Sequence, residues 1–227
     1  MTITLSELRT QARQRADMTA STFVEDSELN SYINNSIAEL HDLLIGAYNE
    51  DYVMESYEFD STLNEISYDL PTDFYKLRGV DVRMSNGEFA TVKRFNFNRR
   101  NEDNNSYAWN LLGLPYLEYR LVGSQIRFNR IPDVNTHFRI YYHPLASKLV
   151  SDSDEFNDIN AYSEYVIVDA AIKMMQKEES DVSVLVMQKE ALKKRIEDMA
   201  QNRDANEPES VTDIYAENND YYWITRT

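Results

Sequence analysis

The sequence contains no cysteine, which excludes a disulfide framework and any chemistry that depends on a thiol. Glycine and proline occur only five times each, so the composition does not fit a fibrous or low-complexity protein. No run of about 18 apolar residues occurs, and we therefore expect neither a membrane span nor a membrane partner. The polar start of the chain argues against a secretory signal.

The motifs of common enzyme classes are missing as well. Every glycine is isolated, so there is no phosphate-binding loop, and no G-x-S-x-G nucleophile elbow occurs. The three histidines do not have zinc-ligand spacing, and we expect no metal ion, no cofactor and no catalytic residue. A cell-wall (peptidoglycan) hydrolase acting through a carboxylate pair remains the alternative function, although such pairs arise by chance among 39 acids. The pairs considered are Glu50 with Asp51 and Asp152 with Asp154.

Basic residues are few relative to acids, 23 against 39, so the formal net charge is −16. A surface of this charge repels the phosphates of DNA at long range, and we expect no sequence-specific DNA binding. The same charge would suit a protein that lets DNA pass without holding it. A third possibility, a carbohydrate- or nucleic-acid-binding β module that stacks ligands on its aromatic rings, is disfavoured for nucleic acid by this charge.

The first fifty residues repeat apolar positions every three or four residues, which predicts two helices. Thr4 and Glu7 have the spacing of a capping box at the start of the first helix. Asp26 is a suitable N-cap for the second helix, which should end near Gly46.

Helical periodicity returns after Pro144. Residues 161–180 are apolar on nearly every side, which predicts a buried central helix. Ser180 is a candidate N-cap for a last helix with one apolar stripe. The stripe consists of Leu185, Leu192, Ile196 and Met199.

Between the helical segments the apolar residues alternate with a period of two, which predicts six or seven short antiparallel strands. A turn or single helical turn is expected around Pro71, and hairpin turns at Ser85–Gly87 and Gly123–Ser124. His137 and His143 flank one strand, and we expect both at its edges.

These patterns predict an α+β fold in three parts. Residues 1–50 and 145–203 form a helical body from both chain ends. Residues 51–144 form an inserted small antiparallel β sandwich or barrel, and residues 204–227 form an extended C-terminal tail.

The tail combines negative charge with an aromatic tip. Its 24 residues include six acids and one arginine, a balance of −5, and when extended they span up to roughly 80 Å. Aromatic side chains supply much of the energy at protein interfaces, so we predict that the tip docks on a partner. Folding back on the chain's own domain is the alternative. The predicted docking residues are Tyr215, Tyr221, Tyr222, Trp223 and Ile224.

The β region differs in charge from the rest of the chain. Between Lys93 and Arg139 there are eight basic and four acidic residues, a balance of +4. These residues are either ordinary outward positions of amphipathic strands or a docking face for acidic neighbours, including copies of the same protein. The residues assigned to such a face are Arg99, Arg100, Arg120, Arg127 and Arg130.

Three segments show a further pattern of helix and strand. They are FVEDSELNSYINNSIAELHDLL at residues 23–44, RLVGSQIRFNRIPDVNTHFRIYYHPLASKL at 120–149, and EYVIVDAAIKMMQKEESDVSVLVMQKEALKKRIEDMAQNRD at 164–204. Together they resemble the head-to-tail adaptor (connector) proteins of tailed bacteriophages. The resemblance covers most of residues 1–215 and includes no invariant catalytic residue.

The resemblance implies a structural virion protein. In this family a helical bundle with a β insertion assembles as about a dozen copies into a ring beneath the portal protein. The C-terminal segment docks on the portal, and the ring conducts genomic DNA and provides the attachment surface for tail tube or nozzle proteins. For this chain we expect the β module to face outward or toward those tail proteins. The expected location is the neck of the virion and, during assembly, the host cytoplasm.

Overall fold

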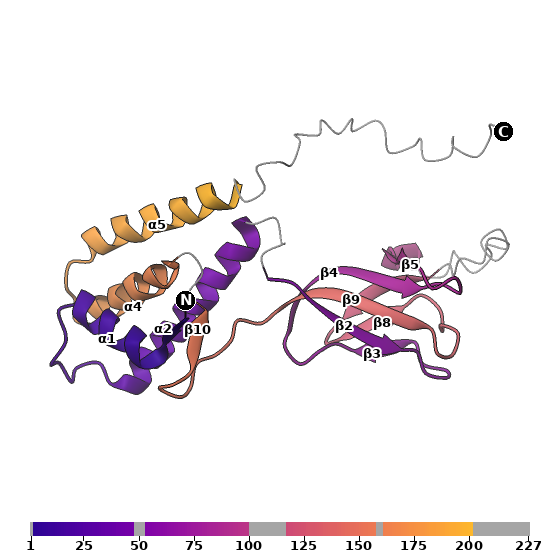
Figure 1. Ribbon diagram of the computed structural model, residues 1–227, viewed down its shortest axis with the longest axis horizontal. Helices are drawn as coiled ribbons and strands as arrows, with labels where there is room; N and C mark the ends of the chain where they lie inside the picture. Colours follow the sequence, from indigo (N-terminus) through magenta and orange to yellow (C-terminus); the bar gives the residue numbers. More distant parts are fainter. Residues whose placement is uncertain (1, 48–52, 100–116, 158–160, 202–227) are drawn as a thin grey trace.

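The computed structural model describes residues 2–47, 53–99, 117–157 and 161–201. Within these ranges the chain forms a helical body and a β module that lie beside each other along the long axis of the molecule (Figure 1). Helices come from both ends of the sequence and the sheets from its middle, so the predicted α+β class is confirmed.

Four helices of the described ranges form the helical body. They are α1 (Leu5–Arg15), α2 (Asp26–Ala47), α4 (Ser163–Lys177) and α5 (Ser183–Gln201). The capping box of α1 is confirmed, because the Thr4 hydroxyl accepts from the Glu7 amide at 3.2 Å and the Glu7 carboxylate accepts from the Thr4 amide at 2.9 Å. The Thr4 amide, together with the Thr4 hydroxyl that donates to the same carboxylate at 3.0 Å, lowers the pKa of Glu7. Helix α2 ends at Ala47, one residue after the predicted Gly46.

Helix α4 is the centre of the helical body, as its sequence predicts. Ten of its fifteen residues are buried. Helices α1 and α2 place Leu5, Leu8, Leu29 and Ile33 against it, all with no exposed surface. Burial of apolar surface on nearly every side explains why this helix needs few polar positions.

Two helix starts differ from the prediction. Asp26 is the first residue of α2 rather than its N-cap, and its carboxylate binds Arg13 at 2.8 Å and Arg9 at 3.3 Å. Helix α5 begins after Asp181, whose carboxylate accepts from the Ser183 amide at 2.9 Å, so Ser180 is not the cap. At α5 the Asp181 side chain thus takes the capping role predicted for Ser180, whereas at α2 the boundary differs from the prediction by one residue.

A short two-stranded ribbon pairs the start of the sequence with a segment that follows the β module. Strand β1 (Thr2–Thr4) pairs antiparallel with β10 (Glu155–Asn157), with Ile3 opposite Phe156. The sequence analysis did not predict this pair, because three residues are too few to show a period of two. The ribbon joins the N-terminus to the segment that follows the β module.

The β module is a sandwich of two four-stranded sheets, with no closed barrel among its described strands. One sheet has the order β2-β9-β4-β5 and the other the order β3-β8-β7-β6, and among the strands that the structure describes only β6 and β7 are parallel. The strands are β2 (Glu55–Asp60), β3 (Ser67–Asp69), β4 (Phe74–Arg83), β5 (Phe89–Thr91), β6 (Lys93–Arg94), β7 (Glu118–Val122), β8 (Gln125–Phe128) and β9 (His137–Pro144). The β module therefore has eight described strands, whereas six or seven were predicted.

Aromatic rings fill the space between the sheets. Phe128 of one sheet stacks on Phe138 of the other with centroids 4.5 Å apart, and Phe59 stacks on Phe138 at 5.3 Å. Val80 and Ile140 are fully buried beside them. The high aromatic content of the sequence is thus explained in part by this core.

The predicted turns around Pro71, at Ser85–Gly87 and at Gly123–Ser124 are present. The turn after Pro71 is short, because β4 begins at Phe74, whose amide donates to the Pro71 carbonyl at 3.0 Å.

His137 and His143 lie inside β9, near its two ends, rather than outside the strand. His137 is partly exposed, whereas His143 is fully buried and its Nδ1 bonds the Val53 carbonyl.

Gly87 provides a local test of the hairpin between β4 and β5. Its φ is +88°, and an added Cβ would meet only Arg83 Nη2 at 4.0 Å, so the cost of a side chain is one of backbone strain. We expect Gly87→Ala to lower the free energy of unfolding by about 1 kcal/mol. Gly46→Ala in α2, where a Cβ has open space, should raise it by up to ~1 kcal/mol. Urea unfolding of both variants measures the two changes in free energy, and changes of the same sign would contradict the prediction.

Candidate functional site

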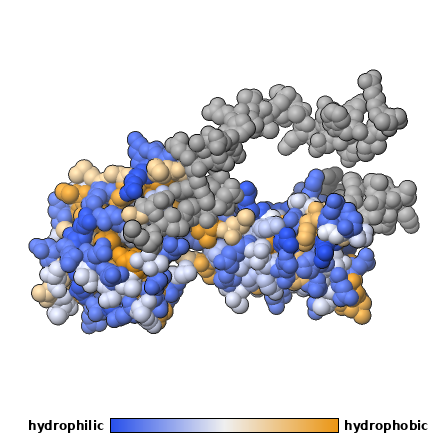
Figure 2. All heavy atoms as spheres, viewed as in Figure 1, coloured by the Kyte–Doolittle hydropathy of each residue, from blue (hydrophilic) through white to orange (hydrophobic). Residues whose placement is uncertain are grey.

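Two hollows in the described surface are candidates for a functional site. One lies at the junction of the helical body and the β module, and the other lies on the outer face of the β3-β8-β7-β6 sheet. Figure 2 shows that hydrophilic residues cover most of the visible face, with apolar spots on the helical body and at the far end of the β module.

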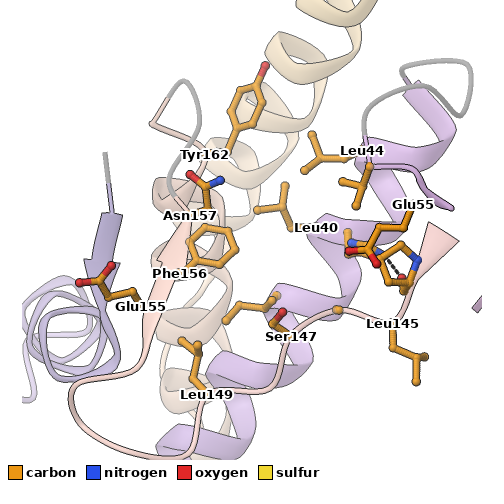
Figure 3. Close-up of a pocket in the computed structure, with 15 residues that line it drawn as sticks. Leu40, Leu44, Glu55, Leu145, Ser147, Leu149, Glu155, Phe156, Asn157 and Tyr162 are labelled. Carbon is orange, nitrogen blue, oxygen red and sulfur yellow. Dashed lines mark hydrogen bonds between the residues drawn. The ribbon is translucent and has the colours of Figure 1, made fainter. Parts of the chain in front are cut away.

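The junction pocket is a cavity of about 290 Å³ (Figure 3). Leu40 and Leu44 of α2, Leu149 after β9, and Phe156 of β10 line it with apolar surface. His41, also in its wall, binds the Pro144 carbonyl through Nε2 at 2.9 Å. This bond and the apolar walls hold the helical body against the end of β9, so the pocket accounts for the joint between the two parts.

The second hollow has a different chemistry. In the β7–β8 hairpin, Arg120 is directly opposite Arg127, while Phe128 and Ile126 of the same hairpin face the core. Two like charges therefore point outward side by side. Within the described ranges no acidic side chain forms an ion pair with either arginine.

An aromatic ring lies beside this pair. Phe97, in the short helix η1 (Phe97–Arg99), is 49% exposed, and the guanidinium carbon of Arg120 lies 5.3 Å from its ring centroid. Val122, also 49% exposed, lines the same hollow, which measures about 410 Å³. We name this hollow the basic groove and define it by Phe97, Arg120, Val122 and Arg127. Its chemistry suits an acidic ligand with apolar or aromatic groups.

A charged cluster joins three helices of the body. Asp169 in α4, only 3% exposed, binds Lys173 at 2.6 Å and Lys189 of α5 at 2.7 Å, and accepts from the Ser36 hydroxyl of α2 at 2.6 Å. Glu39 binds the same two lysines at 2.9 and 3.0 Å. Two acids and two lysines thus balance each other in charge, and they connect α5 to the rest of the body.

The cluster shifts the pKa values of its members. Burial alone would raise the pKa of Asp169, but the hydrogen bonds from Lys173, Lys189 and Ser36 outweigh it and lower that pKa. Burial likewise would lower the pKa of Lys189, yet its bonds to Asp169 and Glu39 raise it. Both groups are therefore charged at neutral pH.

A family model described as SU10 adaptor protein matches residues 3–212, which is most of the chain. The chain belongs to this family of phage head-to-tail adaptor proteins. A search of the curated proteins found no match. The family implies a structural protein in the neck of the virion that interacts with portal and tail proteins, and it is not known for enzymatic activity.

The structure brings together two of the residues predicted for a basic docking face of this adaptor. Arg120 and Arg127 both line the basic groove, whereas Arg130 lies two residues beyond β8 and is partly exposed. Arg99 is the last residue of η1. Arg100 lies outside the described residues, as do the predicted docking residues of the tail, Tyr215, Tyr221, Tyr222, Trp223 and Ile224.

The carboxylates considered for a hydrolase have structural roles in the adaptor. Asp152 binds Arg9, and the Asp154 carboxylate accepts from the amides of Val150 and Ser151 at 2.7 and 2.9 Å. Those hydrogen bonds lower the pKa of Asp154, whereas a glycosidase acid needs a raised one. Glu50 and Asp51 lie outside the described residues.

The described part of the adaptor holds no group of three or more His, Asp or Glu side chains arranged to bind a metal ion. Of its described helices, none combines the length and apolar character that crossing a membrane requires. Sequence reasoning missed Phe97 and the charged cluster. Ser36 and Asp169 are 133 positions apart, so no local pattern could have indicated that pair.

Proposed function

We propose that this adaptor assembles into a ring of about a dozen copies that docks beneath the portal through its C-terminal tail. The ring continues the channel for genomic DNA and presents an attachment surface to tail tube or nozzle proteins. The family match over residues 3–212 is the observation that supports this proposal most strongly, because it includes both the helical body and the β module.

The three predicted parts have separate tasks in this proposal. Residues 1–50 and 145–203 make contacts between subunits and line the lumen, residues 51–144 face outward or toward the tail proteins, and residues 204–227 reach the portal. The described helices and strands are compatible with these boundaries.

The distribution of charge supports a lumen made by the helical body. Residues 1–50 and 145–203 contain 20 acids and 11 basic residues, a balance of −9, whereas residues 51–144 contain 13 and 11, a balance of −2. An acidic wall repels the DNA backbone and allows the duplex to slide. The nearly neutral β module is better suited to contacts with other proteins.

Portal rings should drive the assembly of the adaptor. We expect a monomer or small oligomer in isolation, because the docking surfaces are completed only when the portal is present, and a complex of about a dozen adaptors per portal after mixing. Light scattering coupled to size exclusion measures both states. A stable ring in the absence of portal would contradict assembly on the portal, and no complex after mixing would contradict the proposed docking.

A further inference from the structure

The paired arginines of the basic groove are a destabilising arrangement. Arg120 and Arg127 occupy directly opposed positions of β7 and β8. Side chains so placed have Cβ atoms only about 5 Å apart, and like charges there repel each other. A Glu–Arg pair at these positions would stabilise the hairpin instead, so the two arginines are better explained by a ligand than by the stability of the sheet.

The surroundings of the pair indicate what the ligand contains. Phe97 and Val122 leave half of their surface exposed beside the arginines, and the hollow of about 410 Å³ has room for a large side chain. Arginines next to exposed apolar surface match a segment that contains both carboxylates and aromatic rings.

The C-terminal residues of this chain have that composition. Residues 204–227 contain six acids, one arginine and the run Tyr221, Tyr222, Trp223 and Ile224. The described chain stops at Gln201, the last residue of α5, and Figure 1 shows that α5 ends on the side of the helical body nearest the β module. A further 26 residues extend up to roughly 85 Å, longer than a small domain is wide.

We infer that the basic groove binds residues 204–227 of the same chain before the adaptor meets the portal. This inference depends on the proposed function, since it concerns the tail that later docks on the portal. The arginines neutralise tail carboxylates, and an aromatic ring of the tip lies against Phe97 and Val122. The portal then competes with the groove for the tail, and docking releases it.

Tryptophan fluorescence can test this contact without any portal. The chain has two tryptophans, Trp109 and Trp223, so Trp109→Phe leaves Trp223 as the sole reporter. We expect acrylamide to quench Trp223 about three-fold less in this protein than in a free peptide of residues 204–227, because a bound ring is shielded from the quencher. Arg120→Glu with Arg127→Glu, added to Trp109→Phe, should raise quenching to the level of the peptide.

A matched control separates this contact from a general effect of charge. Arg83→Glu with Lys148→Glu makes the same change of charge at two exposed positions outside the groove, and it should leave Trp223 shielded. Arg120→Gln with Arg127→Gln repeats the test with less repulsion, and circular dichroism checks that each variant is folded. A second measurement uses the chain that lacks its own tail. Peptide 204–227 should bind it about ten-fold more weakly when it carries Arg120→Glu and Arg127→Glu.

Three results would overturn the inference. If Trp223 is as accessible as in the peptide before any groove substitution, the tail is free. If it stays shielded in the groove variants, the tail binds elsewhere. If shielding disappears on dilution, the occupant is the tail of a second copy. Failure to bind portal rings would contradict the proposed function while leaving these measurements unchanged, so the two failures are distinguishable.

Discussion

Removal of residues 204–227 should leave a folded protein that no longer binds portal rings. The two described cores are built from residues 3–200, so the truncation removes none of their members. It does remove the aromatic tip, and aromatic anchors commonly supply most of the energy of an interface. We therefore expect an unchanged unfolding midpoint and an affinity for portal rings that falls at least ~100-fold. Co-sedimentation with purified portal measures the affinity.

Single substitutions in the tail should separate its anchors from its polar lead. Trp223→Ala should weaken portal binding by about 2 kcal/mol, because it removes the large indole ring that we expect to be buried in the portal. Asn218→Ala, in the same tail, is the control and should change affinity by less than about 0.5 kcal/mol. If the truncated chain bound portal as tightly as the intact chain, docking through the tail would be wrong, and contacts of the helical body would have to replace it.

Asp169→Ala should destabilise the helical body by about 3 kcal/mol, the loss expected when one partner of a buried ion pair is removed. Lys173 and Lys189 would then share Glu39 as their one acidic partner in the described part of the chain, and the Ser36 hydroxyl would keep the Tyr32 carbonyl at 2.8 Å as its acceptor. Since Lys189 belongs to α5, the loosening should be greatest where α5 meets α4. Urea unfolding measures the total loss of stability, and hydrogen exchange shows which helices lose protection.

The pH dependence follows from the direction of the pKa shift. The folded protein holds the pKa of Asp169 below its ordinary value of 3.8. The stabilisation is therefore complete above that ordinary value and is lost as the pH falls through the folded pKa. The difference in stability between Asp169→Ala and the unaltered chain should be constant near neutral pH and should shrink below about pH 4.

An exposed ion pair provides the control for this prediction. Asp152 binds Arg9, but its side chain is 73% exposed. Asp152→Ala should cost less than about 1 kcal/mol, because water screens such pairs. Equal losses for the two variants would show that burial of Asp169 does not matter to the strength of the cluster.

The position of α5 links this cluster to the proposed function. Helix α5 is the last described element before residues 204–227, and Lys189 binds both Asp169 and Glu39. A fixed α5 restricts where the tail begins, which reduces the entropy lost when the tail docks. Asp169→Ala should thus weaken portal binding as well as folding, although the residue lies in the core of the helical body.

Local signals in the sequence determined most of the elements. The spacing of Thr4 and Glu7 predicted a capping box, the apolar surface of residues 161–180 predicted a central helix, and the change of period predicted the β insertion. These predictions succeed because hydrogen bonds within a turn and burial of one face depend on residues that are near in sequence. The cap assigned to Ser180 failed because Asp181 accepts from the Ser183 amide instead, and the cap assigned to Asp26 was one residue off because helix ends are weakly specified by sequence.

Only the tertiary structure decided which distant residues meet. The sequence by itself indicated a basic surface in the β region, but the register of β7 and β8 put Arg120 opposite Arg127, and chain folding put Phe97 beside them. The sandwich rather than a barrel, the β1–β10 ribbon and the partners of Asp169 were decided in the same way. Strand register and helix packing depend on the sum of many long-range contacts, and no single stretch of sequence contains that information.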